Sequence, residues 1–337
     1  MAVVGHFESL AEARKIVQSE MIAGVIQETY EEGQLLKMLP VTVIDSRSLI
    51  YNRESTLPSA AFYDIHEQIP WTADVNFVQK EVWLKRIARQ DILDKFMLKT
   101  YRNPNDYRTE ILRALRKGVM RTIEDKLIYG SGSTEASSEF DGLDKLITIA
   151  DGNTFATTQA YDMGGTSPLS LKVLRELIDV VRPKPSILLM TRTMRNTLSA
   201  TAFEKGLVLD LTSTMASISY SKDEFGARVD YFDGIPIVIS DYLLDENDNT
   251  GGKDSGNDSG ISSVYAIRFG AIADGGLSLV VGGDTGGPEF FNVVELDDLE
   301  DYDAGGIRLV AYVTLALGST KALGRIHSID EDGVIVG

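Results

Sequence analysis

Residues 55–86, STLPSAAFYDIHEQIPWTADVNFVQKEVWLKR, hold both tryptophans of the chain, Trp71 and Trp83. Seven further apolar or aromatic residues share the stretch: Phe62, Tyr63, Ile65, Ile69, Val75, Phe77 and Val82. No helical period organises them, and Pro58 and Pro70 interrupt the run. Both flanks have the β-branched and aromatic character of extended chain. The stretch therefore predicts a long hairpin with a broad apolar tip, and it raises the question of what covers that tip.

The composition is that of a folded globular protein. The 337 residues are 43% hydrophobic and 25% charged, enough for two sub-domains with a real core. There is no cysteine, so disulfides and thiolate sites are excluded and a reducing compartment is expected. No secretory signal or uninterrupted apolar run of membrane-spanning length is evident, and we expect no membrane contact.

The net charge of −17 lies in one half of the chain. Residues 1–130 balance 18 basic against 18 acidic residues, so the rest of the chain carries the whole excess. An acidic half argues against broad nucleic-acid binding. From Lys80 to Lys126, however, 13 basic residues outnumber 7 acidic ones. Either this is a solvated helix face with charge pairs, or it makes weak, non-specific contact with a packaged polyanion.

The order of elements is predicted from the periodicity of apolar residues and from residues that begin or end helices and strands. An amphipathic helix opens the chain near Ser9 and Glu12, which form a capping box. A long helix over 103–130 follows the hairpin, with an apolar stripe and with Gly130 expected in the left-handed conformation past its end. Beyond it, alternating strand and helix signals indicate an α/β region, and 245–260 is a loop without apolar residues.

The sequence contains no convincing catalytic, cofactor or metal signature. His6, His66 and His327 lie far apart and in no ligand spacing. The glycine-rich segment VVGGDTGGPE lacks the residues of a phosphate loop, and no nucleophile-elbow motif occurs. We therefore expect a protein that is not an enzyme and that uses neither cofactor nor metal.

The order of these pieces resembles the major capsid proteins of tailed phages, which have the HK97-like fold. The resemblance rests on FYDIHEQIPWT before VWLKRIARQDIL, and on TIEDKLIYGSGST ahead of FDGL. It continues through VLRELIDVVRPKPSILLM, DYFDGIPIVISD and VYAIRFG to IRLVAYVTLALGSTKALGRI. It implies an α+β fold with an N-terminal arm, an extended β-hairpin loop, a peripheral domain with a long spine helix, and an axial α/β domain.

Mapped onto this sequence, the resemblance implies five segments. They are the arm at 1–44, the extended loop at 45–90, the peripheral domain at 91–137 with the spine helix at 103–130, the axial domain at 138–270, and returning peripheral strands with the C-terminus at 271–337. It also implies a role in the virion capsid, assembled in the host bacterial cytoplasm. The expected partners are copies of the chain in hexamers and pentamers, a separate scaffold protein, a portal, and a decoration protein.

In such a shell the hairpin would lie across a neighbouring subunit. The expected intersubunit contacts are Phe62, Tyr63, Ile65, Ile69, Trp71, Phe77 and Trp83. Three alternatives stay open. The hairpin could fold back on its own chain, the chain could be an encapsulin-like shell protein of a bacterial compartment, or it could be a free α/β enzyme or ligand-binding protein.

Overall fold

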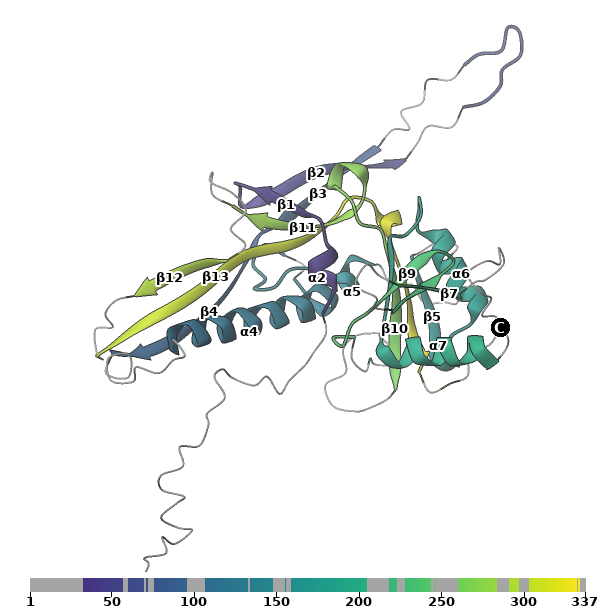
Figure 1. The fold of residues 1–337 in the computed structure, drawn as a ribbon. Coiled ribbons are helices and arrows are strands. Elements are labelled where there is room, and N and C mark those ends of the chain that lie inside the picture. Colours follow the sequence, from purple (N-terminus) through teal and green to yellow (C-terminus); the bar gives the residue numbers. More distant parts are fainter. Residues whose placement is uncertain are drawn as a thin grey trace, which may run out of the picture.

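The structure is a computed structural model of the chain. It describes residues 33–56, 60–69, 71, 76–95, 107–132, 134–147, 155, 159–204, 218–222, 228–243, 246, 260–283, 291–296, 303–331 and 333. The predicted N-terminal helix, most of the 245–260 loop and the first residues of the predicted spine helix lie outside this part of the chain. The described residues form a mixed α+β structure with three sheets (Figure 1).

A five-stranded sheet lies against the long helix α4 (Tyr107–Tyr129). Its central strand is β13 (Ala304–Leu317), with β11 (Leu277–Gly282) and β12 (Asn292–Leu296) on one edge and β4 (Lys85–Asp94) on the other. The short strand β1 (Val41–Ile44) runs parallel to β11. The predicted apolar stripe of α4 is buried at Leu115, Val119, Ile123 and Leu127. Spacings of four residues place this stripe on one side of the helix, the side that meets the sheet.

A seven-stranded sheet forms the other large unit, in the order β5-β14-β10-β6-β9-β8-β7. The bounds of these strands are β5 Ala160–Pro168, β6 Ile187–Met190, β7 Ile218–Lys222, β8 Arg228–Phe232, β9 Ile235–Ile239, β10 Ile261–Ile267 and β14 Leu323–Asp330. Two helices pack on it, α6 (Leu171–Val180) and α7 (Arg192–Glu204). The turn between β8 and β9 is Asp233-Gly234, a dipeptide typical of tight hairpin turns, with positive φ at both residues.

The two faces of this sheet belong to different cores. Leu188 and Met190 of β6 pack with α6 and α7, whereas Ile187 and Leu189 join the core that includes α4 and the five-stranded sheet. Because side chains alternate across a strand, a strand covered on both faces is apolar throughout. This explains the unbroken apolar run of β6 and ties the two sheets together through one shared core.

Four short elements accompany the two sheets. They are α2 (Leu35–Met38), α5 (Leu143–Leu146), and the single 3₁₀ turns η1 (Ile272–Asp274) and η2 (Thr320–Ala322). None of the helices in the described part of the chain is both long enough and apolar enough to cross a bilayer.

The predicted hairpin is present as β2 (Ser48–Thr56) paired antiparallel with β3 (Asn76–Trp83). Its described tip, residues 60–69, stands well away from both large sheets (Figure 1). Asp64 and Glu67 close a local turn: the Glu67 amide donates to the Asp64 carbonyl, and the Asp64 amide donates to the Glu67 carboxylate at 2.8 Å.

The structure corrects two expectations. β14 does not return to the peripheral strands as the assignment of 271–337 implied, because it pairs with β10 and β5 in the seven-stranded sheet. Gly130 does follow the end of α4, but its φ is not positive. Glycine is required there for close packing instead: a Cβ would lie 2.4 Å from the Phe140 carbonyl oxygen. The Gly142 amide donates to the Gly130 carbonyl at 2.9 Å across this contact.

Candidate subunit interface

The tip of the β2–β3 hairpin exposes its aromatic and apolar side chains. The exposed fractions of Phe62 and Trp71 are 107% and 102%, so neither side chain is covered by its own chain. Tyr63, Ile65, Ile69 and, on β3, Phe77 are exposed as well. Trp83 differs from the rest of the predicted set. It is half-buried at the base of the hairpin, opposite Ser48 of β2.

The sequence raised the question of what covers the apolar tip of the hairpin. Large apolar side chains gathered at one place on a surface mark a site that a partner or a membrane covers. In the described part of the chain the tip residues do not fold back onto either core. Apart from Trp83, the residues of the predicted set are therefore exposed on the hairpin and not covered by the described part of the chain.

The base of the hairpin is fixed to the end of β13 by two side chains of β2. The Tyr51 hydroxyl donates to the Leu317 carbonyl at 2.6 Å, and Arg53 Nε donates to the Gly318 carbonyl at 2.8 Å. Arg53 Nη2 also donates to Leu317 O, and its guanidinium lies 5.5 Å from the centre of the Tyr51 ring. Burial raises the pKa of Tyr51, so its hydroxyl stays protonated and able to donate.

Tyr51 and Arg53 share a face of β2 because they are two residues apart. Their acceptors are backbone carbonyls more than 260 residues away in sequence. Backbone acceptors carry no side-chain signature, and sequence reasoning could not have paired these residues. The anchor sets the direction in which the hairpin leaves the body.

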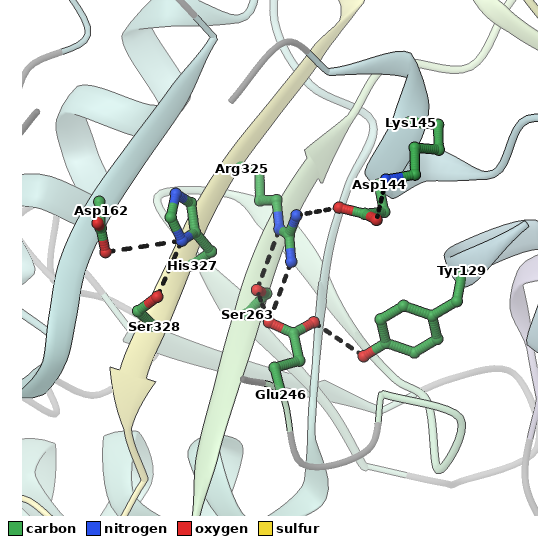
Figure 2. Close-up of polar contacts among 9 residues, drawn as sticks. All are labelled: Tyr129, Asp144, Lys145, Asp162, Glu246, Ser263, Arg325, His327 and Ser328. Carbon is green, nitrogen blue, oxygen red and sulfur yellow. Dashed lines mark hydrogen bonds and ion pairs between the residues drawn. The ribbon is translucent and has the colours of Figure 1, made fainter. Parts of the chain in front are cut away.

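A buried polar network lies where the two large sheets meet (Figure 2). At its centre is Arg325 of β14, which is fully buried. Its Nη1 lies 2.5 Å from Asp144 Oδ1 of α5, its Nη2 lies 3.0 Å from Glu246 Oε2, and its Nε donates to Ser263 Oγ of β10 at 3.1 Å. Glu246 Oε1 accepts a hydrogen bond from the Tyr129 hydroxyl, at the end of α4, at 2.8 Å.

The charges of this network compensate one another in a site without bulk water. Burial alone lowers the pKa of Arg325, but Tyr265, Glu246 and Asp144 beside it raise the value above its ordinary level. The guanidinium also lies 5.1 Å from the centre of the Tyr265 ring. Since its members come from α4, α5, β10 and β14, the network connects the long helix to the seven-stranded sheet.

His327 lies beside this network on the same strand. Its Nδ1 is 2.9 Å from Ser328 Oγ and 3.6 Å from Asp162 Oδ1 (Figure 2). Burial, and then the charge of Arg325, lowers its pKa to about 4. His66 instead sits exposed in the hairpin turn with φ 73°, and His6 lies outside the described residues. Among the residues that the structure describes, no three His, Asp or Glu side chains gather as metal ligands would.

Comparison of the sequence with family models and with curated proteins gave no match. Comparison of the structure with solved structures gave matches. The SrpI encapsulin of Synechococcus elongatus PCC 7942 aligns over 97% of this chain and 98% of its own, with a TM-score of 0.69 and 17% identity. The capsid of a native GTA particle aligns over 94% and 97%, with a TM-score of 0.65 and 12% identity. A structure from Mycobacterium phage Bobi aligns over 95% and 98%, with a TM-score of 0.60 and 13% identity.

The chain has the HK97-like capsid fold. The alignments cover nearly the whole of each chain, so the fold extends over both large sheets and not over one unit alone. With identities below a fifth, what these proteins share with this chain is the HK97-like backbone arrangement.

Proposed function

We propose that this chain is a major capsid protein of a tailed phage, which self-assembles through hexamers and pentamers into an icosahedral shell around double-stranded DNA. The observation that carries the proposal is the exposed hairpin tip on a chain with a capsid fold. Exposure of the apolar surface of Phe62 and Trp71 to water is unfavourable, and burial of these side chains against another subunit would remove that exposure.

The size of this effect is adequate for assembly. If the six exposed residues of the predicted set each bury about 50 Å² of apolar area, the gain is roughly 7 kcal/mol per subunit at about 25 cal/mol/Å². Association entropy and side-chain ordering offset part of this gain. A shell multiplies such contacts over many subunits, so a modest net gain at each contact suffices. We propose Phe62, Tyr63, Ile65, Ile69, Trp71 and Phe77 as intersubunit contacts, with Trp83 supporting them from the hairpin base.

The remaining parts of the proposal follow from a phage capsid role. The chain would act in the virion capsid after assembly in the host bacterial cytoplasm, without catalytic activity. It would assemble with a separate scaffold protein and a portal, and a decoration protein would bind the finished shell.

A second candidate is an encapsulin-like shell protein of a bacterial compartment. The observation that favours it is the alignment with the SrpI encapsulin over nearly the full length of both chains. The two candidates agree on self-assembly and differ in what the shell encloses.

Sedimentation of the purified full chain, expressed alone and with its genomic neighbours, tests the proposal when the fastest fraction is examined by electron microscopy. Closed shells or hexameric and pentameric capsomers are expected. Nuclease-protected DNA inside the shells would support the phage capsid, and protein cargo without DNA would support the compartment. A monomer or dimer under every condition would overturn both.

A further inference from the structure

A basic groove runs along one flank of α4, next to its buried side, since Leu112 and Met120 both line the groove and pack against the core. It encloses about 500 Å³ between α4, the α2 segment and Tyr242. The cationic residues that line it are Lys37, Arg113, Arg116, Lys117 and Arg121. Its apolar lining comes from Leu112, Met120 and Tyr242. Four of the 13 basic residues of the Lys80–Lys126 segment, ambiguous in the sequence, therefore line one groove.

Cationic side chains outnumber carboxylates in the lining of the groove, although the chain has a net charge of −17. The lining includes one carboxylate, Glu124, whose Oε1 accepts a hydrogen bond from the Leu36 amide at 3.0 Å. Burial raises the pKa of Glu124 above its ordinary value. Arg113 forms an ion pair with Glu110 at 3.1 Å, but both heads are partly open to water, where such a pair contributes little.

The spacing of the cations suits a linear anion. Arg113, Arg116, Lys117 and Arg121 follow the helical period, so they form a row on one face about 12 Å long at 1.5 Å per residue. One strand of B-DNA carries a phosphate about every 3.4 Å of helix axis, so the row spans about three or four phosphates. Three of the four are arginines, whose planar guanidinium matches phosphate oxygens in a bidentate geometry.

We infer that this groove contacts the phosphate backbone of double-stranded nucleic acid without reading its sequence. Arg113, Arg116 and Lys117 are exposed, so a duplex too wide to enter the groove still reaches them. The inference rests on the proposed capsid function and deepens it, because it places α4 on the inner surface of the shell. The rival occupant is an acidic protein segment, and residues 1–32 of this chain, with six acidic and two basic residues, have that chemistry.

The inference is tested by the salt dependence of DNA binding. Fluorescence anisotropy of a short, labelled, mixed-sequence DNA duplex is measured with unassembled full-length protein over a range of salt concentrations. Four phosphate contacts predict a fall in affinity of about a hundredfold between about 50 and 200 mM salt. The variant Arg116→Gln with Lys117→Gln removes two contacts and keeps good helix formers, so its fall should be only about tenfold.

The matched control is Lys172→Gln with Arg175→Gln, which removes two exposed cations from α6 on the seven-stranded sheet. It should keep the salt dependence of the wild type. Absence of DNA binding by the wild type, or equal salt dependence of the two double variants, would overturn the inference. Binding of polyglutamate but not DNA through Arg116 and Lys117 would overturn it in favour of an acidic protein segment.

Sedimentation of the same preparations separates this inference from the proposed function. If a protein without DNA affinity forms normal shells, the proposed DNA contact in the groove is refuted and the capsid proposal stands. DNA binding through the groove by a protein that never forms shells would refute the capsid proposal.

Discussion

Arg325 of β14 forms a buried ion pair of 2.5 Å with Asp144 of α5, a residue 181 positions away in sequence. With Glu246 it fastens the seven-stranded sheet to the end of α4. Removing one member of such a network is costly because the others keep their charges without compensation or water.

The variant Arg325→Met tests this network. It leaves Glu246 buried without its ion-pair partner and Asp144 with only the half-exposed Lys145, 3.7 Å away, and we expect the free energy of unfolding to fall by about 3–5 kcal/mol in chemical denaturation. Arg308→Met is the control, since Arg308 is exposed on β13 and pairs only with Gln90 among the described contacts. Equal effects of the two variants would show that the network does not hold the sheets together.

The hairpin tip is expected to serve assembly and not the stability of the subunit. Trp71→Ala should leave the free energy of unfolding of the unassembled chain within about 0.5 kcal/mol of the wild type. It should raise the concentration needed for assembly about tenfold or more, since a buried tryptophan is a typical hot spot. Trp83→Ala, at the half-buried base, should by contrast lower subunit stability. If the Trp71 variant assembles at the same concentration as the wild type, the tip is not part of the subunit interface.

The direction of the hairpin is expected to depend on Arg53. Arg53→Met removes the hydrogen bonds to the Leu317 and Gly318 carbonyls, and amide hydrogen exchange in β2 and β3 should become about tenfold faster. Arg47→Met removes only a surface ion pair with Glu135 and should change little. If exchange in the hairpin is the same in both variants, Arg53 does not anchor it.

Stability should fall in mild acid because of His327. Its pKa is about 4 in the folded chain and 6.5 when unperturbed, so between these values the unfolded state binds more protons and stability is lost as the pH falls. The loss from this group is about 2 kcal/mol between about pH 7.5 and pH 5. Unfolding measured at both pH values should show a smaller difference for His327→Gln, and the wild-type difference for His66→Gln. A His327→Gln variant with the full difference would contradict this.

Two glycines near α4 should respond to alanine in opposite ways. A Cβ at Gly118, inside the helix, has no heavy atom within 4 Å, and Gly118→Ala should stabilise the fold by about 0.5–1 kcal/mol. A Cβ at Gly130 would lie 2.4 Å from the Phe140 carbonyl oxygen and 2.5 Å from that of Lys126, and Gly130→Ala should destabilise by about 2–3 kcal/mol. Thermal or chemical unfolding of both variants tests these two predictions. Destabilisation by Gly118→Ala would show that this face of the helix is packed.

Local patterns in the sequence predicted several of the elements. The apolar stripe of α4 appears at spacings of three and four, the unbroken run of β6 predicts a strand buried on both faces, and Asp233-Gly234 predicts a tight turn. The hairpin was also predictable, because aromatic residues without a helical period between extended flanks have few other structures. The tip residues of the candidate interface follow from the same pattern.

Periodicity shows that a face is buried but not which surface covers it. For that reason only the tertiary structure placed β14 beside β10 and β5, brought Asp144 and Glu246 to Arg325, and joined Arg53 to two backbone carbonyls at the far end of the chain. Gly130 likewise resembled a helix-ending glycine, and only its proximity to Phe140 revealed a packing requirement. The sequence by itself determined which segments are helix, strand and exposed hairpin, since these depend on neighbouring residues. The pairing of distant residues was decided by tertiary structure, because it depends on the path of the whole chain.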